Sequence, residues 1–123
     1  MRGTDLKFTT AGDYMATRSR IGMRNANDTF TSVYVHWDGS PDTRMPILNE
    51  FYNTPEKIEE LLSHGGISSL AGSIEETVFY HRDRGEELDI RTSETLQEFY
   101  YDAYAMSEEY VYLFDNGTLT VRD

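Results

Sequence analysis

The chain of 123 residues contains no cysteine, which excludes a disulfide framework, a thiolate nucleophile and a cysteine-ligated zinc site. It also lacks any apolar run that approaches the roughly 18 residues of a membrane-spanning helix. Its first residues lack the apolar centre of a signal peptide. We therefore expect a cytoplasmic protein without a membrane partner.

Basic residues are scarce, because 11 Lys and Arg stand against 22 Asp and Glu, and the net charge is −11. Residues 1–48 carry +1 and residues 49–123 carry −12. Since attraction to phosphate supplies most non-specific affinity for nucleic acids, direct nucleic-acid binding is disfavoured. An acidic surface can instead attract a basic partner, or it can serve solubility alone.

Aromatic residues are plentiful at 13%, which argues against disorder. The length fits one domain. Because Met15-Ala16-Thr17 resembles a second start, residues 1–14 are expected to form a loosely ordered N-terminal extension. Residues 15–123 are expected to form a single α+β domain.

Two β-hairpins are predicted near the two ends of the domain. Residues 18–24 and 29–37 alternate in polarity around the turn cluster Asn25-Ala26-Asn27-Asp28. In the second of these strands, Phe30, Tyr34 and His36 fall on one face and Val33, Val35 and Trp37 on the other. Residues 110–114 and 118–121 flank a tight Asn-Gly turn and form the other hairpin.

The middle of the chain shows helical spacing and one further strand. A helix is expected over 42–52, a second begins at Thr54-Pro55, and a third is capped by Thr92 or Ser93. Residues 77–81 are β-rich. The predicted fold is therefore α+β: a mostly antiparallel sheet built from the N- and C-terminal β-hairpins plus a middle strand, with about three helices packed on one face.

The pairs His36-x-Asp38 and His81-x-Asp83 are candidates for a site, because residues two apart in a strand share a face. If the two strand ends are neighbours, these side chains could ligate a metal or act as an acid and a base. Trp37 would then offer an apolar wall. The alternative is structural: Asp38 caps a turn, Asp83 pairs with a neighbouring arginine, and the histidines pack beside aromatic rings. No catalytic residue, metal or cofactor is assigned.

Tyrosines and acids also gather late in the chain, where they could form an aromatic, acidic face. Alternatively, part of this cluster belongs to the core. The predicted partner-binding residues are Glu94, Glu98, Tyr101, Asp102, Tyr104, Glu108 and Glu109.

Arg18, Arg20 and Arg24 form the one basic cluster and share a face of the first strand. They could meet a phosphate or an acidic group. They could also protect an edge strand against aggregation, which is the reading we prefer.

Several blocks follow one another in an order that resembles a widespread group of small tailed-phage proteins. The blocks lie at residues 15–22, 36–39, 67–70 and 81–86, and the resemblance covers residues 15–121. Ser40 departs from the group, where a tyrosine is expected before Pro41. The resemblance implies a phage origin and no particular reaction.

The sequence thus predicts a small acidic phage protein that binds and inhibits or redirects a host factor. The host protein would have a basic surface, as in a defence complex, a nuclease or a polymerase, and the acidic half would mimic the charge of nucleic acid. The alternative is a small enzyme or small-ligand or metal binder that uses His36, Asp38, His81 and Asp83. A structural or homo-oligomeric protein is a third possibility.

Overall fold

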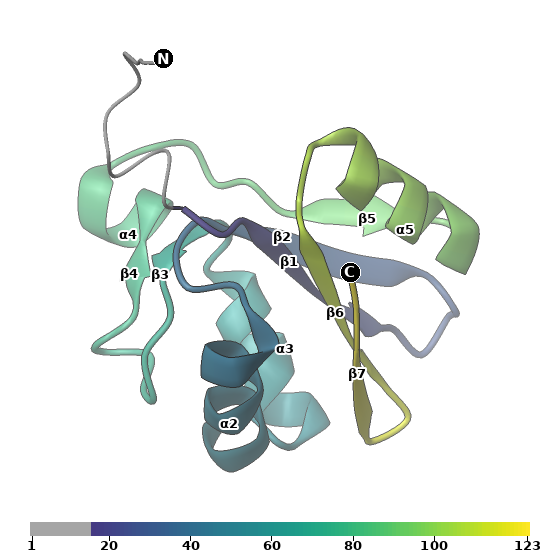
Figure 1. Cartoon of the computed structure of the whole chain (residues 1–123), viewed down its shortest axis with the longest axis horizontal. Helices are drawn as coiled ribbons and strands as arrows, with labels where there is room; N and C mark the ends of the chain where they lie inside the picture. Colours follow the sequence, from purple (N-terminus) through teal and green to yellow (C-terminus); the bar gives the residue numbers. More distant parts are fainter. Residues whose placement is uncertain (1–15) are drawn as a thin grey trace.

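The computed structural model describes residues 16–123 and confirms the α+β class. The strands are β1 (Ser19–Arg24), β2 (Phe30–Val35), β3 (Ile67–Ser69), β4 (Val78–Phe79), β5 (Arg91–Ser93), β6 (Tyr110–Asp115) and β7 (Thr118–Arg122). The helices are α2 (Pro41–Phe51), α3 (Pro55–Ser63), α4 (Tyr80–Arg84) and α5 (Leu96–Ala105) (Figure 1). The expected N-terminal extension, residues 1–14, lies outside the described residues.

The strands form one sheet in the order β4-β3-β2-β1-β6-β7, and β5 pairs with β2. Both predicted hairpins are present as antiparallel pairs, β1 with β2 and β6 with β7. The structure adds two parallel pairings, β1 with β6 and β2 with β3. The sheet is therefore mixed but mostly antiparallel. The two hairpins lie side by side through the pairing of β1 with β6, and β7 forms one edge of the sheet.

Local signals place the ends of several elements. The second predicted helix, α3, begins where the Thr54 side chain accepts a hydrogen bond from the Lys57 amide at 3.2 Å. It is followed by Gly65 in the left-handed region, at φ 80°. Asn116 and Gly117 both have positive φ, 52° and 82°, as a tight two-residue hairpin turn requires.

The predicted strand over 77–81 is shorter than expected. It ends at Phe79, and Tyr80 already begins α4. The cause is a local cap, since the Asp83 carboxylate accepts a hydrogen bond from the Phe79 amide at 2.8 Å. The β-propensity of residues 77–81 does not reveal this competing interaction.

The third predicted helix, α5, begins later than expected. Thr92 and Ser93 are not its caps, because they pair with β2 as part of β5. The cap is Thr95, whose side chain accepts a hydrogen bond from the Glu98 amide at 3.1 Å.

Helices cover both faces of the sheet rather than one. We call the face that packs against α2 and α3 the lower face, and the face that packs against α5 the upper face (Figure 1). The reason lies in β6, where Tyr112 and Phe114 join the core below while Val111 and Leu113 join a smaller core above. Since β6 is apolar on both sides, each side needs a cover.

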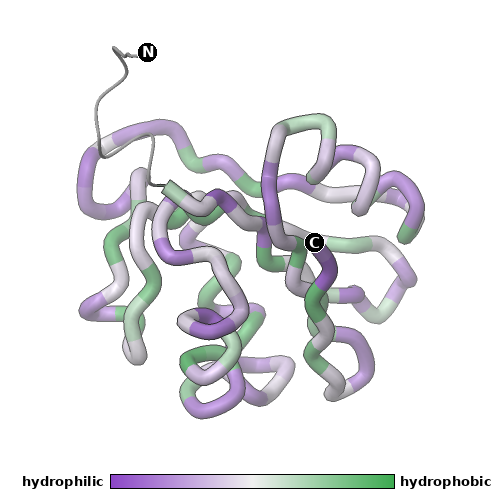
Figure 2. The backbone as a smooth tube through the Cα atoms, viewed as in Figure 1, coloured by the Kyte–Doolittle hydropathy of each residue, from purple (hydrophilic) through white to green (hydrophobic). Residues whose placement is uncertain are grey.

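The two cores differ in extent. The lower core holds twelve buried side chains from strands, α2 and α3, whereas the upper core holds five around Phe30 and Phe99. The segment from α4 towards β5 is mostly hydrophilic (Figure 2), and by their accessible surface residues 81–90 are all exposed. The upper face is therefore only partly covered by apolar packing.

Candidate functional site

The part of the upper face beyond α5 is polar. By strand alternation, Ser32 and Tyr34 share the face of Phe30, and Arg20 lies opposite Tyr34 on β1. Phe30 lies in the core beneath α5, but Tyr34 is only half-buried. This region is the candidate site.

A buried ion pair separates the apolar part of the upper face from this polar part. Arg20 donates to both carboxylate oxygens of Glu108, at 2.8 and 2.9 Å, and to the Ser32 hydroxyl at 3.1 Å. Both charged side chains are almost fully buried, with 3% and 0% of their surface exposed. Such a bidentate pair fixes geometry as well as charge.

Next to this pair lies a cavity of about 360 Å³. Its walls combine aromatic rings and carboxylates: Tyr34, Gly66, Tyr80, Glu86, Glu87 and Asp89. The sheet order explains the assembly, because β2, β3 and β4 are neighbours and bring Tyr34, Gly66 and Tyr80 together. The volume falls at the small end of the usual range for ligand pockets.

The acidic side of the cavity is a loop whose backbone is fixed. Gly85 ends α4 at φ 69°, and the Glu86 amide then donates to the Tyr80 carbonyl at 3.0 Å. The Nδ1 atom of His81 lies 2.8 Å from the Glu86 carbonyl oxygen. Further along, Leu88 lies against Gly65, where an added Cβ would be 2.8 Å from the leucine side chain. Residues 86–89 are thus held over Gly66 and Tyr80.

His36 is placed beside the cavity rather than in its lining. Its Nδ1 atom lies 2.6 Å from the Tyr34 hydroxyl, and its ring meets Trp37 edge-on at 4.6 Å between centroids. Burial raises the pKa of Tyr34 above its ordinary value, and Arg18 opposes this rise. Of the sequence-predicted ligand residues, His36 and His81 therefore contact groups that form the cavity.

Asp38 and the backbone of Trp37 belong to a tight loop on the lower side. The buried Arg44 donates to the carbonyls of Trp37 and Asp38, at 2.8 and 3.2 Å, and to the Ser19 hydroxyl at 2.8 Å. Asp38 has φ 58°, and an added Cβ at Gly39 would lie 2.5 Å from the Thr17 carbonyl oxygen. The block from His36 to Ser40 thus has a structural role, because it forms the loop that Arg44 holds in place.

Arg44 was not anticipated as a core residue. It is 1% exposed, and its guanidinium lies 5.7 Å from the centroid of the Tyr112 ring. Burial lowers the pKa of Arg44 to about 10 and raises that of Tyr112 to about 12. Tyr112 in turn donates to the Gly39 carbonyl at 2.6 Å.

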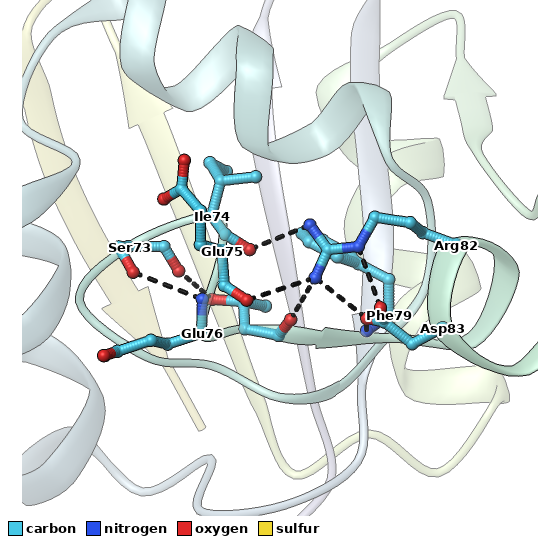
Figure 3. A network of polar contacts seen from close by, with 8 residues as sticks. Ser73, Ile74, Glu75, Glu76, Phe79, Arg82 and Asp83 are labelled. Atoms are coloured by element: carbon cyan, nitrogen blue, oxygen red, sulfur yellow. Dashed lines mark hydrogen bonds and ion pairs between the residues drawn. The ribbon is translucent and has the colours of Figure 1, made fainter.

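Asp83 is engaged by its neighbours, as the structural alternative predicted. Its carboxylate accepts hydrogen bonds from Arg82, at 2.9 and 3.0 Å, as well as from the Phe79 amide. Figure 3 shows the Arg82 guanidinium between Asp83 and the backbone oxygens of Ile74 and Glu75. Arg82 therefore ties α4 to the loop before β4.

Within residues 16–123, no three or more His, Asp or Glu side chains are grouped so as to hold a metal ion. The metal version of the alternative function has no support in this part of the chain. The His36 and His81 positions beside the cavity remain compatible with a metal-free ligand site.

The predicted partner-binding residues fall into two groups. Most of them lie on or beside α5 at the surface, where Tyr101 and Tyr104 are 64% and 40% exposed. Glu108 is the exception and corrects the prediction: it is buried in the pair with Arg20 and offers no surface charge. The remaining acids are Glu94, Glu98, Asp102 and Glu109.

The arginines of β1 do not form one basic patch. Arg20 is paired with Glu108 inside the protein. Arg24 pairs with Asp115 at 2.8 Å and lies 4.8 Å from the centroid of the Phe30 ring. Since β1 is flanked by β2 and β6, the preferred edge-strand interpretation is wrong.

Comparison with known protein families, curated proteins and solved structures finds no match. None of the helices in residues 16–123 is long and apolar enough to cross a membrane.

Proposed function

We propose that this protein acts by binding a partner macromolecule with a basic surface. The observation that carries the proposal is the α5 surface, which we define as the exposed residues Glu94, Glu98, Tyr101, Tyr104, Met106 and Glu109 together with the half-buried Asp102. Tyrosine is enriched at protein interfaces because it combines a large ring with a hydroxyl.

The carboxylates of this surface are available. Within residues 16–123, the ion pairs join Arg20, Arg24 and Arg82 to acids elsewhere, and none includes an acid of the α5 surface. The nearby cations are occupied: Arg91 contacts the Met106 sulfur, and Arg122 stacks 4.1 Å from the centroid of the Tyr100 ring. Glu98 accepts a hydrogen bond from the Glu94 amide. Within residues 16–123, no Lys or Arg forms an ion pair with an acid of the α5 surface, which therefore presents negative charge.

Charge density decides how far the surface can imitate nucleic acid. Within α5, Glu98 and Asp102 are four residues apart, which along a helix gives one charge per ~6 Å. Duplex DNA has one charge per ~1.7 Å of its axis. The α5 surface alone is much sparser, so charge mimicry would need the carboxylates of residues 86–89 on the same face as well.

The resemblance to small phage proteins extends the proposal to a biological setting. The partner would be a host nuclease, polymerase or defence complex whose basic cleft normally binds nucleic acid, and binding would inhibit or redirect it. The resemblance supports only the phage setting, whereas the acidic surface supports a partner with a basic surface.

The test is capture of partners from a bacterial lysate with three matched proteins. The test variant carries Glu94→Lys, Asp102→Lys and Glu109→Lys. The control carries Glu50→Lys, Glu59→Lys and Glu60→Lys, which are exposed residues of α2 and α3 and give the same change in net charge. Glu98 is left intact because its carboxylate accepts a hydrogen bond from the Glu94 amide at the start of α5.

We expect the wild type and the control to retain the same protein at low salt and to release it at high salt. The test variant should bind it about tenfold more weakly or worse, equivalent to about 1.4 kcal/mol or more. Added duplex DNA should displace the partner if the surface imitates nucleic acid. Equal retention by all three proteins would refute the proposal.

A small-ligand site remains the second candidate function. One observation favours it, namely the cavity beside Tyr34 and His36.

A further inference from the structure

The cavity on the polar part of the upper face combines features that select for one kind of chemical group. Its lining contains two tyrosine rings, a glycine and the three acidic residues Glu86, Glu87 and Asp89. Aromatic faces attract cations, and planar cations best of all, because a guanidinium can stack on a ring and bind carboxylates through a fork of N–H groups. We propose that the cavity is a binding site for a guanidinium group, such as an arginine side chain of a peptide or protein.

The shape of the cavity suits this group. About 360 Å³ is at the low end for ligand sites, so it accommodates a side chain or a small cation better than a large cofactor. Gly66 contributes no side chain to the wall, and an added Cβ there would lie 3.4 Å from the Tyr80 ring. The whole stretch 81–90 is exposed, so the acidic side of the cavity is accessible from solvent.

The charge balance around the cavity is negative. Two arginines of the chain approach it: Arg84 lies 5.3 Å from the centroid of the Tyr80 ring and donates to the Ser68 hydroxyl at 3.3 Å, and Arg18 acts on Tyr34. The three rim carboxylates outnumber these two positive charges. Within residues 16–123, none of the three forms an ion pair with Lys or Arg. Anionic ligands such as nucleotides are therefore disfavoured.

The chain itself shows that its rings accept guanidinium groups. Besides Arg84 on Tyr80, Arg82 lies 4.9 Å from the Phe79 ring centroid and Arg122 lies 4.1 Å from that of Tyr100. An incoming arginine would use the same contact on Tyr34 or on the cavity side of Tyr80. Unlike the internal arginines, it would also meet the carboxylates of the rim.

None of the residues that line the cavity belongs to the α5 surface. Arginine binding here goes beyond the proposed partner binding and can be true or false independently. The variant Glu94→Lys, Asp102→Lys, Glu109→Lys is used in both experiments. It should no longer bind the partner but should still bind arginine in the cavity.

The probe is the blocked tripeptide acetyl-Gly-Arg-Gly-amide, titrated into the isotope-labelled full chain and followed by NMR. The control peptide replaces arginine with citrulline, which has nearly the same shape but no charge. We expect saturable shifts at the amides of Gly66 and residues 86–89, with a dissociation constant on the order of 1 mM. The citrulline peptide should bind at least tenfold more weakly.

Two variants test the two parts of the recognition. Glu87→Gln with Asp89→Asn removes charge from exposed residues and should weaken binding about fivefold or more. Tyr34→Leu keeps an apolar side chain but removes one ring, and should weaken it by a similar factor. Glu59→Gln with Glu60→Gln on α3 removes the same charge on the opposite face and should leave binding unchanged.

Three outcomes would overturn the assignment: equal binding of the arginine and citrulline peptides, shifts confined to α5, or equal weakening by the rim and α3 variants. Loss of arginine binding in the α5 variant would show that the tripeptide binds through the overall negative charge of the protein and not in the cavity. A spectrum that is unchanged away from the substituted residues verifies that each variant is folded.

Discussion

Each face of the sheet buries an arginine, and the two faces satisfy its charge in different ways. Neighbouring residues of β1 show the difference. Ser19 points to the lower face and meets the buried Arg44, whereas Arg20 points to the upper face and meets the buried Glu108. Below, the guanidinium is held by carbonyls, a hydroxyl and the Tyr112 ring. On the upper face, the Arg20 guanidinium is held by the Glu108 carboxylate.

The difference matches what each face does. Arg44 sits inside a large apolar core and organises a loop, so neutral oxygens suffice to satisfy it. The Arg20–Glu108 pair lies beside the cavity, where it closes the apolar core without adding net charge to the polar region. The lower face is thus built for stability, and the upper face keeps part of its area open.

The largest expected effect comes from breaking the ion pair of the upper face. Glu108→Ala should lower the free energy of unfolding by about 3–5 kcal/mol, because it leaves Arg20 buried without a counter-charge. Urea unfolding measures the loss. The double variant Arg20→Met, Glu108→Leu should recover most of it, since apolar side chains of similar volume avoid the desolvation cost. A loss below about 1 kcal/mol in the single variant would mean that Arg20 readily reaches water.

A pair of glycine substitutions compares the covered and open parts of the upper face. At Gly22 an added Cβ would lie 2.6 Å from the Phe99 ring, so Gly22→Ala should cost about 1–3 kcal/mol through overpacking. At Gly66 the nearest contact is an ordinary 3.4 Å, so Gly66→Ala should change stability by about 0.5 kcal/mol or less. Thermal unfolding of both variants distinguishes the sites, and equal costs would contradict the difference in packing.

The smallest effect concerns Asp83, at the edge of the open region. Hydrogen bonds from Arg82 and the Phe79 amide hold the pKa of this carboxyl below its ordinary value of 3.8. Its contribution to folding is therefore present above pH 3.8 and is lost as the pH falls through the lower, folded-state pKa. The Phe79 amide signal in NMR should titrate with a midpoint below 3.8 and lose this titration in Asp83→Asn. A midpoint at or above 3.8 would refute the cap.

The sequence predicted those parts of the fold that depend on neighbours in the chain. The Asn-Gly turn and the Thr54 cap are local, and the C-terminal hairpin and the α3 helix followed from them. The side of the sheet taken by α5 was not local, because it depends on the apolar upper side of β6. The short helix α4 was missed because one carboxylate outweighed the β-propensity of its residues.

The candidate site was predicted only in part, for the same reason. Alternation in β2 indicated that Tyr34 and His36 share a face, and the charged run after His81 was visible. Their meeting at one cavity requires the order β4-β3-β2, which no short pattern encodes. Glu108 shows the converse: beside the exposed Glu109, nothing local marks it as buried, since its partner is 88 positions away.

The separation of Arg20 and Glu108 by 88 positions also has a consequence for synthesis of the chain on the ribosome. A ribosome completes β1 and Arg20 early, but the carboxylate that neutralises Arg20 and the strand that flanks β1 follow only about ninety residues later. Until then the N-terminal hairpin exposes an unpaired strand beside a charge meant for the interior. A nascent chain that stops before residue 108 lacks both the counter-charge of Arg20 and the strand that pairs with β1 in parallel, so β1 stays an open edge in every interrupted product.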